Sequence, residues 1–175
     1  MAAVTEDYSG TVTRFILLTD IAGSSRLAEA YPEQYYAALE AHNCIIEHAT
    51  AVQGGEILKH LGDGYLALFG DAASAINAAV AVQLALNAGQ QGSIAIFADG
   101  SKFSVRAIVH GGRLTRLAGQ DQDWFGPPLN RCARICKVCH PGQLLISGVV
   151  RAALTALPPE LAELDLGRVR LRDLG

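Results

Sequence analysis

Two ionisable side chains, Lys59 and Asp63, lie four positions apart in the run EILKHLGDGYLALF, residues 56–69. Alternating apolar runs flank Gly62-Asp63-Gly64, and this arrangement predicts a β-hairpin because glycine accepts a positive φ. The hairpin would carry a carboxylate at its tip and an ammonium group on its incoming strand. The charge of Lys59 must reach solvent, form a pair or face a cleft. For Asp63 the simpler alternative is that it serves only the chemistry of the turn.

A second carboxylate, Asp20, follows an apolar run over residues 15–19 that is typical of a strand buried on both faces. Gly23, Ser24 and Ser25 come next, and the sequence predicts a helix from about Ser24. Backbone N–H groups at such a strand-to-helix junction can bind phosphate. The alternative is that Asp20 or a serine only caps the helix.

A third group of polar residues lies on a helix predicted over residues 128–139, which proline favours at its start. Asn130 and Arg134 are four positions apart and therefore share one face of this helix, which Cys132 and Ile135 do not. An amide beside a guanidinium group suits a ribose and a phosphate. Arg134 could equally be a solvent-exposed surface charge.

Three of the four cysteines cluster in the run CARICKVCH. The four are Cys44, Cys132, Cys136 and Cys139. Haem attachment at the C-x-x-C-H pattern would need export and an axial ligand, yet the only methionine is Met1. A zinc site would need His140 beside Cys139, which is an awkward geometry. We therefore expect small buried residues and reduced thiols, which suit a cytoplasmic protein.

Composition bounds the class of protein. The chain has 175 residues, 50% hydrophobic and 18% charged, as expected for one domain with an apolar core. Its formal charge of -3 argues against a nucleic-acid partner, which would require a basic face. No apolar run approaches the roughly 18 residues of a membrane span, and the N-terminus lacks the features of a signal peptide. We expect a cytoplasmic protein without a membrane segment.

The predicted elements alternate between strands and helices. Besides the hairpin and the elements above, we expect helices over 31–52, 71–86 and 148–157, and strands over 94–97, 104–110, 144–147 and 164–174. His42 and His48 fall within the first of these helices and are expected to be packing or surface residues. The order predicts an α+β fold, in which helices pack on a mixed, mostly antiparallel sheet.

Five runs of the sequence together resemble the catalytic domain of the class III nucleotidyl cyclases. They read FILLTDIAGSSRLAE, GGEILKHLGDGYLALFGD, VRAIVHGG, DWFGPPLNRCARI and LGRVRLRDLG. The resemblance covers residues 13–175, after a lead-in segment over 1–12. It implies a fold related to ferredoxin-like palm domains and a head-to-tail homodimer with active sites in the interface. Since the family usually continues with another strand, the chain is expected to be a domain excised from a larger signalling protein.

The resemblance also implies two metal ions and a nucleotide substrate. Asp20 and Asp63 would hold two Mg²⁺ or Mn²⁺ ions, with the carbonyl group of Ile21 completing one site. The triphosphate would lie near Gly23, Ser24 and Ser25. Oxygen ligands are those that such hard cations prefer, so this implication agrees with the carboxylates found from the residues alone. Other phosphate contacts are open among Arg113, Arg116, Arg168 and Arg170.

The resemblance gives the remaining motif residues two tasks, which are to recognise the base and ribose and to stabilise the transition state. Lys59 and Asp123 would recognise adenine, Asn130 would orient the ribose, and Arg134 would stabilise charge on the α-phosphate. In the homodimer, these four residues would face the Asp20 and Asp63 of the other subunit. A different alignment would place Asp121 in the role of Asp123.

The reaction implied is the conversion of ATP to 3′,5′-cyclic AMP and pyrophosphate. An aspartate acceptor and a lysine donor match the edge of adenine, whereas guanine goes with glutamate and cysteine at these positions in the family. Two alternatives stay open. One is a guanylate cyclase, and the other is a catalytically inactive module of the same fold that binds nucleotide or dimerises.

Overall fold

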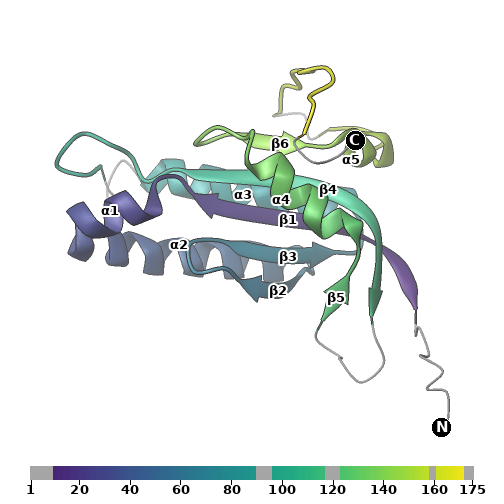
Figure 1. The fold of residues 1–175 in the computed structure, drawn as a ribbon, viewed down its shortest axis with the longest axis horizontal. Helices are drawn as coiled ribbons and strands as arrows, with labels where there is room; N and C mark the ends of the chain where they lie inside the picture. Colours follow the sequence, from purple (N-terminus) through teal and green to yellow (C-terminus); the bar gives the residue numbers. More distant parts are fainter. Residues whose placement is uncertain (1–9, 90–95, 117–122, 158–160, 172–175) are drawn as a thin grey trace, which may run out of the picture.

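A six-stranded sheet runs through the computed structural model, which describes residues 10–89, 96–116, 123–157 and 161–171 (Figure 1). The strands are β1 (Thr11–Ile21), β2 (Glu56–His60), β3 (Tyr65–Phe69), β4 (Val105–Arg116), β5 (Trp124–Phe125) and β6 (Leu144–Ile146). The helices are α1 (Ser24–Ala30), α2 (Pro32–Val52), α3 (Ala72–Gly89), α4 (Pro127–Cys136) and α5 (Gly148–Ala153).

The strand order is β2-β3-β1-β4-β5. β6 is outside this order and pairs with residues 107–109 of β4. All pairs are antiparallel except β4 with β6, which is parallel. This arrangement confirms the predicted α+β fold with a mixed sheet. β1 lies in the centre because its apolar residues 15–19 can be buried on both faces.

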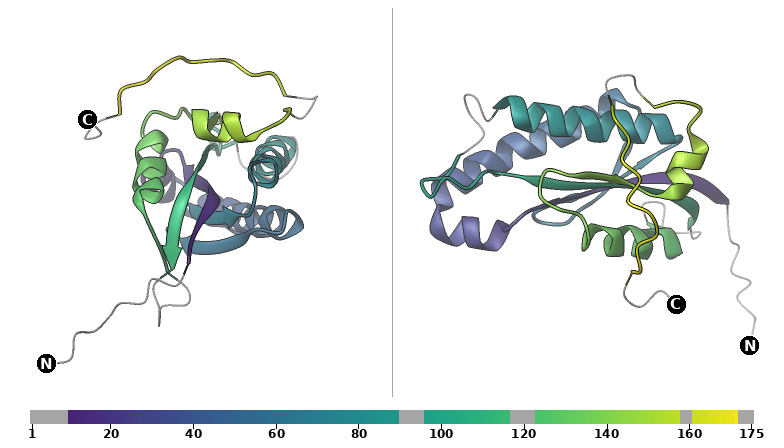
Figure 2. Two further views of the ribbon diagram at one scale, coloured as in Figure 1. Left: turned by 90° about the vertical axis from the view of Figure 1, so that its right-hand side faces the viewer. Right: turned by 90° about the horizontal axis from the view of Figure 1, so that it is seen from above.

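The alternation of side chains along β1 separates two layers of helices. Phe15 and Leu17 belong to a buried cluster with alanines of α3. Ile16 and Leu18 belong to a different cluster, which includes Cys132 of α4. Figure 2 shows α4 on one side of the sheet and α2 and α3 on the other. We call the side on which Ile16 and Leu18 pack the α4 face.

Helix boundaries follow the local chemistry of the sequence. Pro32 occupies the first turn of α2, as predicted, because proline needs no N–H partner there. At the start of α3 the Asp71 carboxylate accepts a hydrogen bond from the backbone N–H of Ser74, at 2.8 Å. This bond lowers the pKa of Asp71. The predicted capping role of Asp71 is therefore confirmed.

The last part of the chain differs from the prediction. The helix expected over 148–157 ends at Ala153, and residues 161–171 form no strand. The backbone N–H of Gly167 donates to the Asp165 carboxylate at 2.8 Å, and Gly167 has a φ of 69°, so a turn interrupts the alternating pattern. In Figure 2 this segment crosses the β6 edge of the sheet towards the α4 side. Residues 172–174 of the expected strand lie outside the described residues.

The strand expected over 94–97 is also not formed in its described part. Ile96 makes one isolated bridge with Lys102, and residues 94 and 95 lie outside the described residues. The bridge closes around Gly100, whose φ of 79° suits the turn predicted from Asp99-Gly100. The strand expected over 104–110 is present and extends to Arg116.

The expected burial is found for Cys132 and Cys139, whereas Cys136 is partly buried and Cys44 is exposed; His42 and His48 are a packing and a surface residue, as expected. Cys132 and Cys139 are buried, and burial raises the pKa of both thiols, which disfavours the thiolate form that binds metals. His42 is fully buried against the rings of Tyr65 and Phe103, whereas His48 is exposed. Burial lowers the pKa of His42, so this side chain serves packing in its neutral form. No helix among the described residues is long and apolar enough to cross a membrane.

Gly64 is the position where the fold leaves the least room. A Cβ atom there would lie 2.0 Å from the carbonyl oxygen of Thr19, which is backbone and cannot rotate away.

We therefore expect Gly64→Ala to lower the free energy of unfolding by about 1–3 kcal/mol, as overpacking does. At Gly70 a Cβ atom would meet nothing within 4 Å. Gly70→Ala should stay within about 0.5 kcal/mol of the wild type. Urea unfolding followed by circular dichroism measures both, and equal stabilities would contradict the prediction.

Candidate active site

The tip of the β2–β3 hairpin is joined to the end of β1 by two hydrogen bonds, one between backbone groups and one from a backbone N–H to a side-chain hydroxyl. The N–H of Ile21 donates to the carbonyl group of Asp63 at 3.0 Å. The N–H of Tyr65 donates to the hydroxyl group of Thr19, also at 3.0 Å. Since Asp20 lies between Thr19 and Ile21, these bonds bring the two predicted metal ligands to one place in the fold.

The side chain of Asp63 is held from α1. The hydroxyl group of Ser24 donates to the Asp63 carboxylate at 2.5 Å, a short bond of the kind that charged acceptors form. Gly23 precedes the helix with a φ of 71°, a left-handed conformation that lets the chain turn from β1 into α1. Asp63 therefore makes a contact outside its own turn. Ser25 is exposed beside this contact.

The side chain of Asp20 pairs with Arg106 of β4. The two residues lie opposite each other in the β1–β4 register, and the Arg106 guanidinium donates to the Asp20 carboxylate. Both side chains are about one-third exposed, at 33% for Asp20 and 29% for Arg106. The sequence reasoning did not single out Arg106. Only the pairing of β1 with β4 shows that Arg106, in the VRAIVHGG run, lies beside the Asp20 carboxylate.

Lys59 lies on the same side of the sheet as Asp20. It is paired with Leu66 of β3, which is in turn paired with Leu18 of β1, so the three side chains form one row across the α4 face. Asp20 is two residues beyond Leu18 on this face. Lys59 itself is exposed, so its charge reaches solvent although its strand is largely apolar.

The remaining predicted residues lie on or next to α4 and β5. Asp123 directly precedes β5 and is exposed, and Asn130 is also exposed. Arg134 is half-buried on α4. Cys132 between them is fully buried against the sheet, so Asn130 and Arg134 lie on the opposite side of the helix. The shared helix face predicted for these two residues is therefore present.

The strand order puts Lys59 and Asp123 at opposite edges of the sheet, on β2 and beside β5. One ion pair connects these edges. Arg116, opposite Trp124 in the β4–β5 pair, lies 3.5 Å from Glu56 at the start of β2. In Figure 1 the end of β4 bends towards β2 and takes β5 with it. Asp123, next to Trp124, is thus brought towards the start of β2, three residues before Lys59.

The end of α4 lies beside the two carboxylates. Burial raises the pKa of Cys136 to about 11, and the charges of Asp20 and Asp63 add to this effect while Arg106 opposes it. Cys136 packs on the α4 face, next to the sheet. Arg134 is two residues away, about 200° around the helix, so its side chain leaves the helix on the side opposite to that of Cys136.

The donor set at the end of β1 suits a hard divalent cation with ligands from a substrate. No group of three or more His, Cys, Asp or Glu side chains occurs among the described residues, so the arrangement does not fit a structural zinc site. Two carboxylates and the Ile21 carbonyl group would offer oxygen ligands. Mg²⁺ is commonly bound by one or two carboxylates and completed by water and substrate phosphates, and the residues present fit this pattern.

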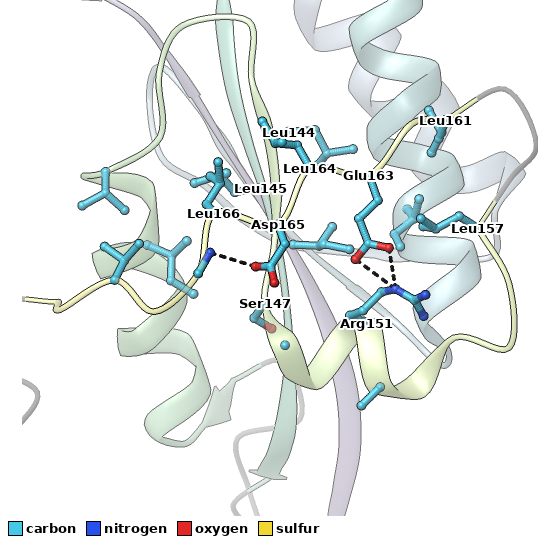
Figure 3. A pocket seen from close by; sticks show the side chains of 18 of the residues that line it. Leu144, Leu145, Ser147, Arg151, Leu157, Leu161, Glu163, Leu164, Asp165 and Leu166 are labelled. Carbon is cyan, nitrogen blue, oxygen red and sulfur yellow. Dashed lines mark hydrogen bonds and ion pairs between the residues drawn. The ribbon is translucent and has the colours of Figure 1, made fainter.

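A cavity of about 760 Å³ lies elsewhere, beneath residues 161–171 (Figure 3). Its lining is largely leucine, isoleucine and valine from β6, α5 and the C-terminal segment. Arg151 and Glu163 form an ion pair at its rim, at 2.8 Å. None of the predicted site residues lines this cavity, so it is separate from the candidate active site.

Comparisons with known proteins agree with this geometry. The model of the family described as adenylate and guanylate cyclase catalytic domain matches residues 6–173. An adenylate cyclase of Lachancea kluyveri is 32% identical over 148 residues, which are 75% of this chain and 8% of that protein. An uncharacterized protein of Mycobacterium tuberculosis is 31% identical over 169 residues, 95% of this chain and 53% of its own length. The chain thus spans about half or less of these relatives.

A solved structure shows the same fold. The crystal structure of an adenylate/guanylate cyclase/hydrolase from Silicibacter pomeroyi has a TM-score of 0.77 and 25% identity. The match covers 95% of this chain and 92% of that chain. The arrangement of strands and helices described above is therefore one that cyclase domains adopt.

The contact between Ser24 and Asp63 yields a prediction. Ser24→Ala removes a hydrogen bond to a charged group and should lower the free energy of unfolding by about 1–2 kcal/mol. Ser25 is the next residue of α1 and is exposed, so Ser25→Ala should change this quantity by less than about 0.5 kcal/mol. Urea unfolding of both variants provides the measurement. Equal effects of the two substitutions would show that the Ser24 hydroxyl does not hold Asp63.

Proposed function

Because the chain belongs to the family of adenylate and guanylate cyclase catalytic domains, we propose that it converts ATP to 3′,5′-cyclic AMP and pyrophosphate. The observation that carries the proposal is the hydrogen bond from Ile21 to Asp63, which brings two carboxylates to the end of β1. The choice of ATP is supported by the fungal relative that is named an adenylate cyclase. It also agrees with the acceptor and donor groups of Asp123 and Lys59.

Asp20, Asp63 and the carbonyl group of Ile21 would bind two Mg²⁺ or Mn²⁺ ions together with the triphosphate. When bound, such ions lower the pKa of the ribose 3′-hydroxyl group and neutralise the leaving phosphates. Ser24 keeps the Asp63 carboxylate in one orientation, since its hydroxyl group occupies one carboxylate oxygen. The exposed Gly23 and Ser25 remain candidates for contacts with the triphosphate.

Arg106 has two roles in this proposal. Its guanidinium compensates the charge of Asp20 and fixes the direction of that carboxylate in the absence of substrate. A triphosphate brings several negative charges to the same place, and the guanidinium is then positioned to donate hydrogen bonds to phosphate oxygens. The residue thereby contributes positive charge beside the Asp20 and Asp63 carboxylates of its own chain.

The chemical step is an in-line attack of the ribose 3′-oxygen on the α-phosphorus, with pyrophosphate as the leaving group. Asn130 would orient the ribose, so that the two reacting atoms meet in a productive geometry. Arg134 would donate hydrogen bonds to the α-phosphate as negative charge builds up there. Lys59 would donate to N1 of adenine, and Asp123 would accept from its 6-amino group.

The orientation of Arg134 supports a homodimer with shared active sites. Cys136 faces the carboxylates of its own chain, and Arg134 lies on the opposite side of the same helix. One copy therefore does not direct Arg134 towards a nucleotide held at its own Asp20 and Asp63. A second copy can supply this group, and head-to-tail pairing gives each site the carboxylates of one subunit and the Arg134 of the other.

The substrate can be tested with purified protein at high concentration. The protein is incubated with Mn²⁺ and either ATP or GTP, and the products are separated by chromatography. We expect cyclic AMP from ATP and much less cyclic GMP from GTP, because Asp123 and Lys59 match the hydrogen-bonding edge of adenine. Predominant formation of cyclic GMP would make the protein a guanylate cyclase. Absence of both products would leave a module that binds nucleotide or dimerises.

A further inference from the structure

Trp124 is the only tryptophan of the chain and directly follows Asp123. Its strand, β5, contains only Trp124 and Phe125, opposite Arg116 and Thr115 of β4. A strand of two residues makes few backbone hydrogen bonds. Side-chain packing must therefore determine where the neighbouring Asp123 lies.

The indole ring of Trp124 is in cation–π contact with two guanidinium groups from different strands. The Cζ atom of Arg14 on β1 is 5.3 Å from the ring centroid, and that of Arg116 on β4 is 4.8 Å away. Trp124 is only 8% exposed. Because cation–π attraction is stronger where water is excluded, the two arginines fix the ring and with it β5.

Arg116 also contacts the opposite edge of the sheet. Its Nη2 atom lies 3.5 Å from the carboxylate of Glu56, which is three residues before Lys59 on β2. One planar guanidinium thus touches both the residue that follows Asp123 and the strand that carries Lys59. Arg116 is thus a physical link between the strand of Lys59 and the residue next to Asp123.

We propose that Arg116, assisted by Arg14, is a positioning residue for base selection that holds Asp123 and Lys59 at the separation a purine edge requires. The inference rests on the proposed function, in which Asp123 and Lys59 read the base. It gives Arg116 a different role from the phosphate contact considered from the sequence, since its guanidinium is engaged by Trp124 and Glu56.

Three variants separate positioning from a general effect of charge. Arg116→Gln removes the cation. Arg116→Lys keeps the charge but loses the planar fork that stacks and pairs at the same time. Arg151→Gln is the matched control, because Arg151 also forms an exposed ion pair with a glutamate, Glu163, but lies at the separate cavity beneath residues 161–171. Arg14→Gln removes the other guanidinium group that contacts Trp124, and it provides a second test should Arg116→Gln fail to fold.

The first readout is the ratio of kcat/KM for ATP to that for GTP. Arg116→Gln should lower this ratio about three- to tenfold, the scale of one lost cation–π contact, chiefly through a higher KM for ATP. Arg116→Lys should fall between this variant and the wild type. Arg151→Gln should keep the wild-type ratio. A loss of kcat for both nucleotides alike would indicate a structural role only and overturn the proposal.

The second readout is the fluorescence of Trp124, which needs no turnover. Titration with ATP or GTP should change its emission, with tighter binding of ATP, and Arg116→Gln should reduce this preference together with the ratio of kcat/KM. If the wild type forms no cyclic nucleotide, the proposed function fails, and the binding preference alone still decides the role of Arg116. An unchanged preference in Arg116→Gln, or no response to either nucleotide, would overturn the inference.

Discussion

The backbone hydrogen bond from Ile21 to Asp63 is the constraint on which the site depends. It fixes the hairpin tip against the end of β1, and the bond from Tyr65 to Thr19 keeps the same register. Gly64 is required next to it, because the carbonyl group of Thr19 leaves no space for a side chain. Backbone geometry therefore brings the two residues together, and the side chains of Ser24 and Arg106 hold their carboxylates, a preorganisation that the proposed metal site would use.

The alternation of side chains across the sheet determines how the other groups are distributed. Lys59, Asp20 and Arg106 share the α4 face because their strands pair in one register. The helix on this face packs Cys136 next to the sheet, and Arg134 leaves the helix on the opposite side. In the proposed function, a single chain therefore carries two incomplete halves of an active site. In the proposed homodimer each half meets the complementary half of the other copy.

Much of this arrangement could be predicted from the sequence, because it depends on local patterns. The hairpin, the buried strand before Asp20, and the shared helix face of Asn130 and Arg134 follow from turn residues and periodicity. The Arg106 ion pair and the Arg116 contacts could not, since they depend on register between strands distant in the sequence. The strand expected over 164–174 was wrong because a local turn at Gly167 interrupts its alternating pattern.

The most direct test of the central claim is complementation between two inactive variants. Asp20→Ala lacks a metal ligand and Arg134→Ala lacks the group for the α-phosphate, so each homodimer should form little cyclic AMP. Mixing the two under conditions of demonstrated subunit exchange should restore activity, because one of the two sites in each hybrid dimer is then wholly wild type. Persistent inactivity despite exchange would place both residues in the site of one chain and contradict the account.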